Sequence, residues 1–234
     1  MIIHVARQLL PSWRGAFADN QTNGEYISNA VDSGKRALKN LSLQMLVKAT
    51  HPDAILLCQA QYGNANNMTD IYAALHALLN NNHEWNKNST QKYLSHFYSN
   101  YMGDALVVDK WFSLQATRAG CDLRDIVYLR NHADFDIKNP NRVRSVLHAF
   151  CFSNPNSFHN ISGDCYAFWA REVLVLDVIN PQVAARLARA LDNWRRFAPA
   201  YKMHMKKALE YIASVTTLSG DVSEVIQKSL WENQ

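Results

Sequence analysis

The chain has 234 residues, of which 48% are hydrophobic and 19% charged, and its formal net charge is +4. These values are typical of a globular protein and exclude a disordered chain. The charge is too small, and the basic residues too widely spread, to indicate a nucleic-acid-binding protein. No run approaches the roughly 18 apolar residues of a membrane helix, and the first residues do not resemble a signal peptide. We therefore expect a cytoplasmic protein that binds neither nucleic acid nor membrane.

Apolar residues recur at three- and four-residue steps through nearly the whole chain, which indicates helices. The pattern predicts helices at residues 32–49, 54–60, 67–79, 89–98, 104–116, 123–129, 164–178, 199–215 and 221–230, and two more that begin at Asn139 and Asn180. Strand signals are weak, and residues 11–31 could form a loop. About ten short helices favour an all-α fold of stacked antiparallel helix pairs, HEAT- or armadillo-like, over a four-helix bundle, which needs fewer and longer helices.

The two helices that begin at Asn139 and Asn180 share a start signal. Both open with Asn followed by Pro, and both carry an arginine in the second turn, Arg144 in the first and Arg186 in the second. An Asn side chain caps the free backbone N–H groups of a helix start, and Pro has no N–H group to leave unpaired. Local chemistry therefore determines where both helices begin.

The periodicity of these two helices admits two interpretations of Arg144 and Arg186. At about 100° per residue, each arginine falls beside the apolar stripe of its helix, with Arg142 on the other side of the first stripe. In one interpretation their stems cover apolar surface while the guanidinium groups meet water. In the other, they line a cavity and recognise a carboxylate or carbonyl, which suits their planar set of donors. Periodicity by itself favours the first interpretation.

The four cysteines are scattered along the chain: Cys58, Cys121, Cys151 and Cys165. None belongs to a Cys-x-x-Cys pair, so we expect buried, reduced thiols. Cys151 and Cys165 together with His148 and His159 offer proper zinc ligands, but their spacing matches no defined zinc motif. The sequence therefore favours no metal site in this chain.

The sequence carries no catalytic motif. Its one His-Glu pair, His83–Glu84, has no second histidine one turn later, so the zinc-binding pattern His-Glu-x-x-His is absent. A nucleophile elbow, a phosphate loop and a dinucleotide fingerprint are absent as well. We therefore predict a chain with no catalytic residues and no cofactor of its own.

Several blocks of the sequence resemble, in the same order, the C-terminal part of bacterial-type aminopeptidase N, a zinc metallopeptidase family. The blocks are Ser33–Asn40, Ala65–Asp70, Val108–Ala116, the two Asn-Pro helix starts, Phe158–His159, Tyr166 and Leu218–Asp221. Each block is weak by itself, but the shared order and similar gaps make the resemblance strong. Residues 1–28 show no comparable match.

The resemblance implies one C-terminal helical domain over residues 1–234, least defined over residues 1–30, and folded as a right-handed superhelix. In that family this domain closes over the catalytic domain and leaves an internal chamber. The resemblance further implies that Gln182 approaches the pocket for the first side chain of a peptide substrate. Arg186 and Arg144 would line the chamber, where they could hold the peptide's carboxylate or carbonyl.

The expected role is therefore that of a non-catalytic part of an enzyme that removes N-terminal amino acids from peptides. The zinc would belong to the parent enzyme, and the partners would be its catalytic domain and the peptide substrate. An alternative is a free-standing helical-repeat adaptor that binds a protein or peptide. A domain separated from its catalytic neighbour should expose apolar surface, so we also expect an uncovered apolar face near residues 1–50.

Overall fold

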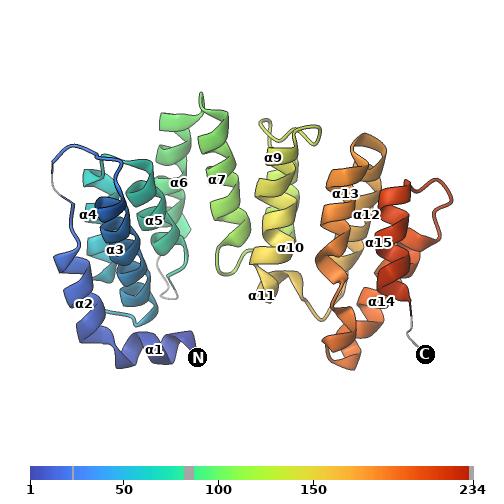
Figure 1. Ribbon diagram of the computed structural model, residues 1–234, viewed down its shortest axis with the longest axis horizontal. Coiled ribbons are helices and arrows are strands. Elements are labelled where there is room, and N and C mark those ends of the chain that lie inside the picture. Colours follow the sequence, from blue (N-terminus) through green and yellow to red (C-terminus); the bar gives the residue numbers. More distant parts are fainter. Residues whose placement is uncertain (23, 82–86, 232–234) are drawn as a thin grey trace. The chain divides into compact units, whose positions relative to one another are not determined.

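The computed structural model describes residues 1–22, 24–81 and 87–231 of the chain. Throughout these residues the regular structure is helical (Figure 1). The chain divides into two compact units, residues 1–114 and 115–234, and each is described by itself. A single domain over residues 1–234 stays a prediction.

The first unit contains six helices within its described residues and most of a seventh. They are α1 (Ile2–Gln8), α2 (Leu10–Asp19), α3 (Ala30–Lys48), α4 (Ala54–Asn64), α5 (Met68–Leu79), α6 (Lys87–Tyr101) and α7 (Ala105–Thr117). The predicted helices of this region are confirmed, with their largest boundary error at the end of α4, which continues past residue 60, whereas α1 was not predicted. The His83–Glu84 pair lies outside the described residues.

The prediction of a loop over residues 11–31 is wrong for its first half. Residues 10–19 form α2, and Leu10, Trp13 and Phe17 pack from it against the core of the first unit. These three residues stand at helical spacing, so the periodic signal was present. The helix has no side-chain cap and no fully buried residue. The sequence therefore offers neither a capping residue at its start nor a strong apolar stripe by which to predict it.

Helices α3, α4 and α5 form the centre of the first unit. Their shared core consists of Leu43, Leu46, Val47, Ala54, Cys58, Ala74, Ala77 and Leu78. Beside it, Lys39 of α3 and Asp70 of α5 form a buried ion pair with 2.7 Å between Nζ and Oδ2. Asn40 donates to the other oxygen of Asp70 at 2.8 Å. Two of the sequence blocks with family resemblance therefore meet in one buried polar cluster.

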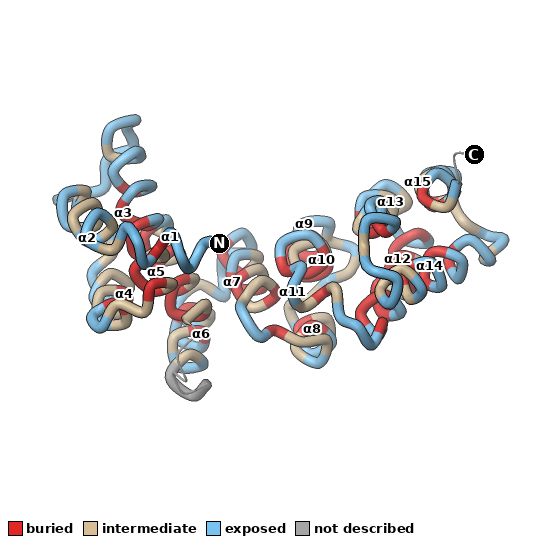
Figure 2. Tube along the Cα trace, turned by 90° about the horizontal axis from the view of Figure 1, so that it is seen from below, coloured by how far each residue is buried: buried red, intermediate tan, exposed pale blue. Residues whose placement is uncertain are grey.

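The second unit begins within α7 and continues through shorter elements. They are α8 (Leu123–Arg130), α9 (Pro140–Val143), the π-helical η1 (Arg144–His148), α10 (Ala149–Ser153), α11 (Pro155–Phe158), α12 (Asp164–Ile179), α13 (Pro181–Ala188), the 3₁₀ turns η2 (Arg189–Leu191) and η3 (Trp194–Arg196), α14 (Pro199–Ala213) and α15 (Gly220–Leu230). Helices α8, α12 and α14 form one layer, and α10, α13 and α15 form the other (Figure 2).

Neutral side-chain donors tie the helices of the second unit together. The indole N–H of Trp169 in α12 donates to the carbonyl of Leu187 in α13 at 2.9 Å. The indole of Trp194 donates to Ser229 of α15, also at 2.9 Å. Both carbonyls lie near helix ends, where backbone acceptors lack partners within the helix. The aromatic rings thus fill the core while their polar atoms fix the position of each helix pair.

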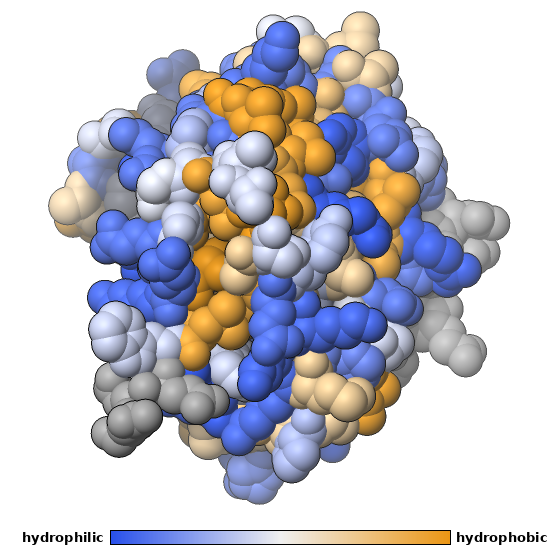
Figure 3. All heavy atoms as spheres, turned by 90° about the vertical axis from the view of Figure 1, so that its right-hand side faces the viewer, coloured by the Kyte–Doolittle hydropathy of each residue, from blue (hydrophilic) through white to orange (hydrophobic). Residues whose placement is uncertain are grey.

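Exposed apolar side chains occur in both units. In the first unit, Ile2 and Val5 of α1 and Leu9 directly after it are exposed, as are Val31 and Leu38, which lie two turns apart on α3. One uncovered apolar face within residues 1–50 stays a prediction. In the second unit, a band of hydrophobic residues bordered by hydrophilic ones crosses the face seen in Figure 3.

Candidate functional site

The helix α13 carries two of the three residues for which the sequence suggested a role. Its start is capped as predicted: the Asn180 side chain accepts from the backbone N–H of Val183 at 3.2 Å, and Pro181 occupies the first turn. Since Leu187 is held against α12 through Trp169, the orientation of α13 is determined. Gln182 and Arg186, one turn apart, are both exposed on α13.

The first Asn-Pro helix starts as predicted but does not continue as a regular α-helix. Asn139 Oδ1 accepts from the backbone N–H groups of Asn141 at 3.0 Å and Arg142 at 3.4 Å. After Val143 the backbone widens into the π-helical segment η1, which begins at Arg144. π-Helical segments within α-helices are uncommon and occur frequently at functional sites.

The two arginines of this helix have opposite environments, although the sequence placed them symmetrically about the apolar stripe. Arg142 is buried, with 6% of its surface exposed, because the packing of the second unit covers that flank. Arg144 is exposed, and its guanidinium lies 3.5 Å from Asn141 Oδ1. Burial and the charge of Arg144 lower the pKa of His148. Only Arg144 thus has a guanidinium open to water.

Arg144, Gln182 and Arg186 lie on elements of the same layer, η1 with α10 and α13 (Figure 2). Within the described residues no hydrogen bond or ion pair joins Arg144 to either of the other two. All three side chains are exposed, and the Arg144 guanidinium contacts Asn141. The exposure of Arg144 and Arg186 agrees with the first interpretation, in which their stems cover apolar surface and their guanidinium groups meet water. A role in binding stays a proposal.

Three of the four possible zinc ligands noted in the sequence have other contacts, and the ring of His148 stacks on that of Phe152 with 4.1 Å between centroids. His159 Nδ1 lies 3.2 Å from the Tyr166 hydroxyl, and the Cys165 thiol lies 3.6 Å from the Ser157 carbonyl. Cys151 is buried, and burial raises its pKa well above the ordinary value, so it stays a neutral thiol. Among the described residues, no group of three or more His, Cys, Asp or Glu side chains could hold a metal ion. All four cysteines of the chain are free and buried, as expected.

Sequence reasoning missed the buried polar cluster around Asp70. Gln61 donates to Asn40 Oδ1 at 2.7 Å, and Asn67 both caps α5 and donates to Asp70. Burial raises the pKa of Asp70, but hydrogen bonds from Lys39, Asn67 and Asn40 outweigh it and bring the pKa below its ordinary value. The only signal was the resemblance itself, because nothing in periodicity pairs Lys39 with a residue 31 positions later.

The fold defines a helical-repeat protein, built from stacked α-helices throughout the residues that the structure describes. Over residues 1–231 the chain matches the family described as "Domain of unknown function (DUF3458_C) ARM repeats", and it belongs to that family. The part of the chain that the structure describes holds no helix long and apolar enough to cross a membrane.

The chain is also similar to longer proteins. It is 35% identical over 218 residues to aminopeptidase N of Caulobacter vibrioides, a match that covers 93% of this chain and 25% of that protein. It is 38% identical to aminopeptidase N of Haemophilus influenzae, covering 88% of this chain and 23% of that protein. The crystal structure of Legionella pneumophila aminopeptidase A in complex with aspartic acid matches with a TM-score of 0.84 and 27% identity, covering 98% of this chain and 27% of that one. The chain thus spans about a quarter of the length of these relatives.

Proposed function

We propose that this chain is the non-catalytic C-terminal domain of a zinc-dependent aminopeptidase N, which encloses the active site of a catalytic domain and positions the peptide substrate. The observation that carries the proposal is the match of nearly the whole chain to one quarter of aminopeptidase N at 35–38% identity. An aminopeptidase removes residues from the N-terminus of a peptide. The chemical step would be performed by groups outside the 234 residues.

Three side chains would contact the substrate. Arg186 and Arg144 each offer a planar fork of donors that matches a carboxylate or a peptide carbonyl. Gln182, one turn before Arg186, would approach the first side chain of the peptide. Since all three are exposed, a catalytic domain lying over them would exclude water and strengthen these contacts.

The zinc ion of the proposed enzyme would be held outside this chain. The sequence lacks the pattern His-Glu-x-x-His, and the described residues offer no alternative cluster of ligands. This region would therefore act on the reaction by orienting the peptide and excluding water, not by activating the attacking water.

The exposed apolar residues of α1 and α3 support an interface with a further domain. Ile2 and Val5 on α1, Leu9 directly after it, and Val31 and Leu38 on α3 are between 39% and 69% exposed. Where such side chains gather into one apolar patch, they mark a site of association. In the proposed enzyme the catalytic domain covers it.

The proposal is tested with the complete open reading frame that contains this chain. The frame should encode His-Glu-x-x-His upstream, and its purified product should hydrolyse an aminoacyl p-nitroanilide in a zinc-dependent manner. A frame without that motif, or a product that forms a saturable protein complex and hydrolyses nothing, would favour the adaptor alternative.

The residue roles are tested separately in the same full-length enzyme. Arg186→Ala and Arg144→Ala should each lower kcat/KM for a tripeptide by about tenfold, because each removes a charged hydrogen bond to the substrate. An aminoacyl p-nitroanilide has no carboxylate and should be affected much less. Arg196→Ala, an exposed arginine of η3, is the matched control. Unchanged kinetics in all variants would refute these roles while leaving the enzyme assignment intact.

A further inference from the structure

A polar pocket of about 390 Å³ lies in the first unit, beside the buried ion pair of Lys39 and Asp70. Lys39 of α3, Gln61 of α4 and Asp70 of α5 all line it. The apolar side chains of Phe17 and Leu57 line it as well. The pocket is separate from the three substrate-binding residues proposed above, since all of those belong to the second unit.

The hydrogen bonds around Asp70 determine which atom of Gln61 remains unpaired. The Asp70 carboxylate can only accept, so Asn40 turns its amide nitrogen toward it, and Nδ2 donates to Oδ1 at 2.8 Å. The Asn40 oxygen consequently faces Gln61, whose Nε2 donates to it at 2.7 Å and to the Asp70 backbone carbonyl at 3.0 Å. Both N–H groups of the Gln61 amide are thereby used. Its Oε1 atom is buried and has no hydrogen-bond partner among the described residues.

The Lys39 ammonium also has unused hydrogen-bonding capacity. An ammonium group carries three N–H donors, and within the described part of the chain Lys39 donates only to Asp70. Its side chain is 5% exposed, so bulk water has little access to the other two donors. Buried polar groups that lack partners are costly and uncommon in folded proteins. The residues lining the pocket thus bring together unpaired donors and one unpaired acceptor.

The balance of charge at the pocket indicates an uncharged ligand. The positive charge of Lys39 is already neutralised by Asp70, whose pKa lies below its ordinary value and which therefore stays ionised. An anionic ligand would be repelled by the Asp70 carboxylate and by the unpaired oxygen of Gln61. A neutral group that both accepts and donates would satisfy Lys39 and Gln61 together.

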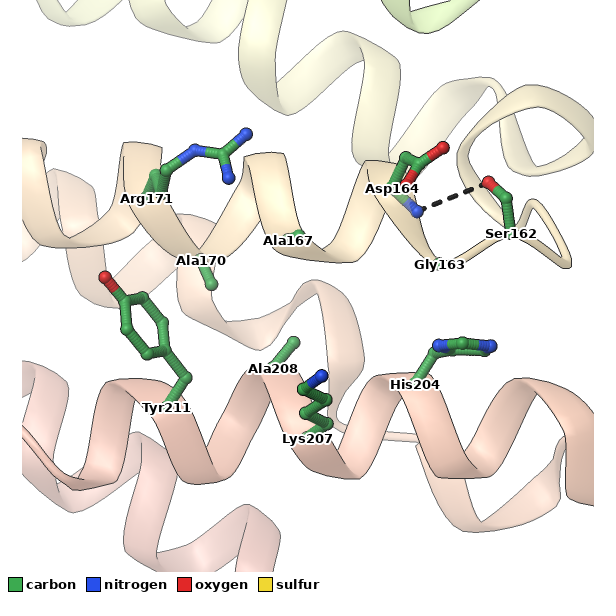
Figure 4. Close-up of a pocket in the computed structure, with 10 residues that line it drawn as sticks. All are labelled: Ser162, Gly163, Asp164, Ala167, Ala170, Arg171, His204, Lys207, Ala208 and Tyr211. Atoms are coloured by element: carbon green, nitrogen blue, oxygen red, sulfur yellow. Dashed lines mark hydrogen bonds between the residues drawn. The ribbon is translucent and has the colours of Figure 1, made fainter.

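A groove in the second unit lacks these features. It measures about 520 Å³ and lies between α12 and α14 (Figure 4). Its floor consists of alanines, and its two cations, Arg171 and Lys207, are exposed and lie apart. Among the described residues, no buried side-chain polar atom without a partner lines it. The unpaired buried groups therefore distinguish the pocket of the first unit.

We propose that the pocket beside Asp70 binds a small neutral ligand through a carboxamide group, whose carbonyl accepts from Lys39 and whose N–H donates to Gln61 Oε1. A carboxamide supplies both an acceptor and donors without a charge. The apolar body of the ligand lies against Phe17 and Leu57, which line the same pocket. The inference does not depend on the proposed aminopeptidase function.

The test is a titration of the ¹⁵N-labelled 234-residue chain with benzamide, N-methylbenzamide, benzoate and benzyl alcohol, followed by ¹⁵N–¹H NMR. Benzamide should give saturable shifts at amides of α3, α4 and α5. Benzoate, which is charged, and benzyl alcohol, which has a single oxygen to donate and accept, should bind at least tenfold more weakly. Saturation by N-methylbenzamide as well identifies a site that accepts the amide of a peptide bond, and saturation by benzamide alone identifies a site for primary amides.

Three variants sharpen the titration. Ala60→Phe fills the pocket from an exposed position of α4 that lines it, and should weaken benzamide binding at least tenfold without touching the polar cluster. Leu56→Phe is the matched control, since Leu56 is 65% exposed on the same helix and does not line the pocket. Gln61→Leu removes the unpaired acceptor and should weaken binding about tenfold.

Circular dichroism verifies that each variant is folded, and Ala60→Phe decides the matter if Gln61→Leu does not fold. The proposal is overturned if benzamide does not saturate, which would leave water as the only occupant of the pocket. It is equally overturned if benzoate or benzyl alcohol binds as tightly as benzamide, or if folded Ala60→Phe or Gln61→Leu binds benzamide like the unmodified chain.

Discussion

The two units differ in how deeply they bury their ion pairs between helices. In the first unit, Lys39 and Asp70 are almost fully buried and form an ion pair inside a polar cluster. In the second unit, Arg130 pairs with Glu172 at 3.0 Å while both are only partly buried, and the buried carboxylate of Asp177 accepts from the backbone N–H of Ser219. Charge therefore serves the fold in both units, and the substrate-binding role proposed above falls on Arg144 and Arg186, which are exposed. Four predictions test this contrast.

The largest effect is expected at the buried ion pair. Asp70→Ala leaves the Lys39 ammonium without its partner in the interior, which should lower the free energy of unfolding by about 3–5 kcal/mol. Urea unfolding followed by circular dichroism measures the change. The double variant Lys39→Met/Asp70→Leu, which removes both charges, should recover part of the loss. Equal loss in the single and double variants would show that packing, not charge, dominates at this site.

The same pair should make stability depend on pH. The pKa of Asp70 is below its ordinary value in the folded chain, so its contribution is fully present above the unfolded pKa of about 4 and is lost as the pH falls through the folded pKa. Unfolding in urea at a series of pH values should show this loss, and it should be smaller in Asp70→Asn. An identical pH dependence in both proteins would contradict the linkage.

A smaller effect is expected where α12 meets α14. Gly163→Ala places a side chain at positive φ and against the ring of His204, which should cost about 1–3 kcal/mol. Thermal unfolding measures the loss. Gly34→Ala, in the interior of α3 where a Cβ meets nothing within 4 Å, is the control and should be neutral or stabilising. Equal effects would show that the close approach is dispensable.

The smallest effect on stability is expected for the exposed arginines. Arg144→Ala and Arg186→Ala should change the free energy of unfolding by no more than about 0.5 kcal/mol, because neither side chain is buried. Chemical denaturation tests this, with Arg142→Ala as the contrasting variant, since Arg142 is buried and its loss should be clearly larger. A large loss at Arg186 would assign that residue to the fold and not to a ligand.

Local signals in the sequence determined the helices and many of their ends. Asn67, Asn139 and Asn180 cap helices where the residue pattern predicted, because a cap depends on atoms within three residues of it. The all-helical class follows from periodicity in the same way. The block order also indicated the family, since the order of motifs is a property of the chain itself.

Tertiary packing decided the rest. The sequence treats Arg142 and Arg144 alike, yet packing buries the first and exposes the second. The partners Lys39 and Asp70 come from different helices, so no local pattern links them. Burial and pairing depend on which helix faces cover one another, and that is a property of the whole folded chain.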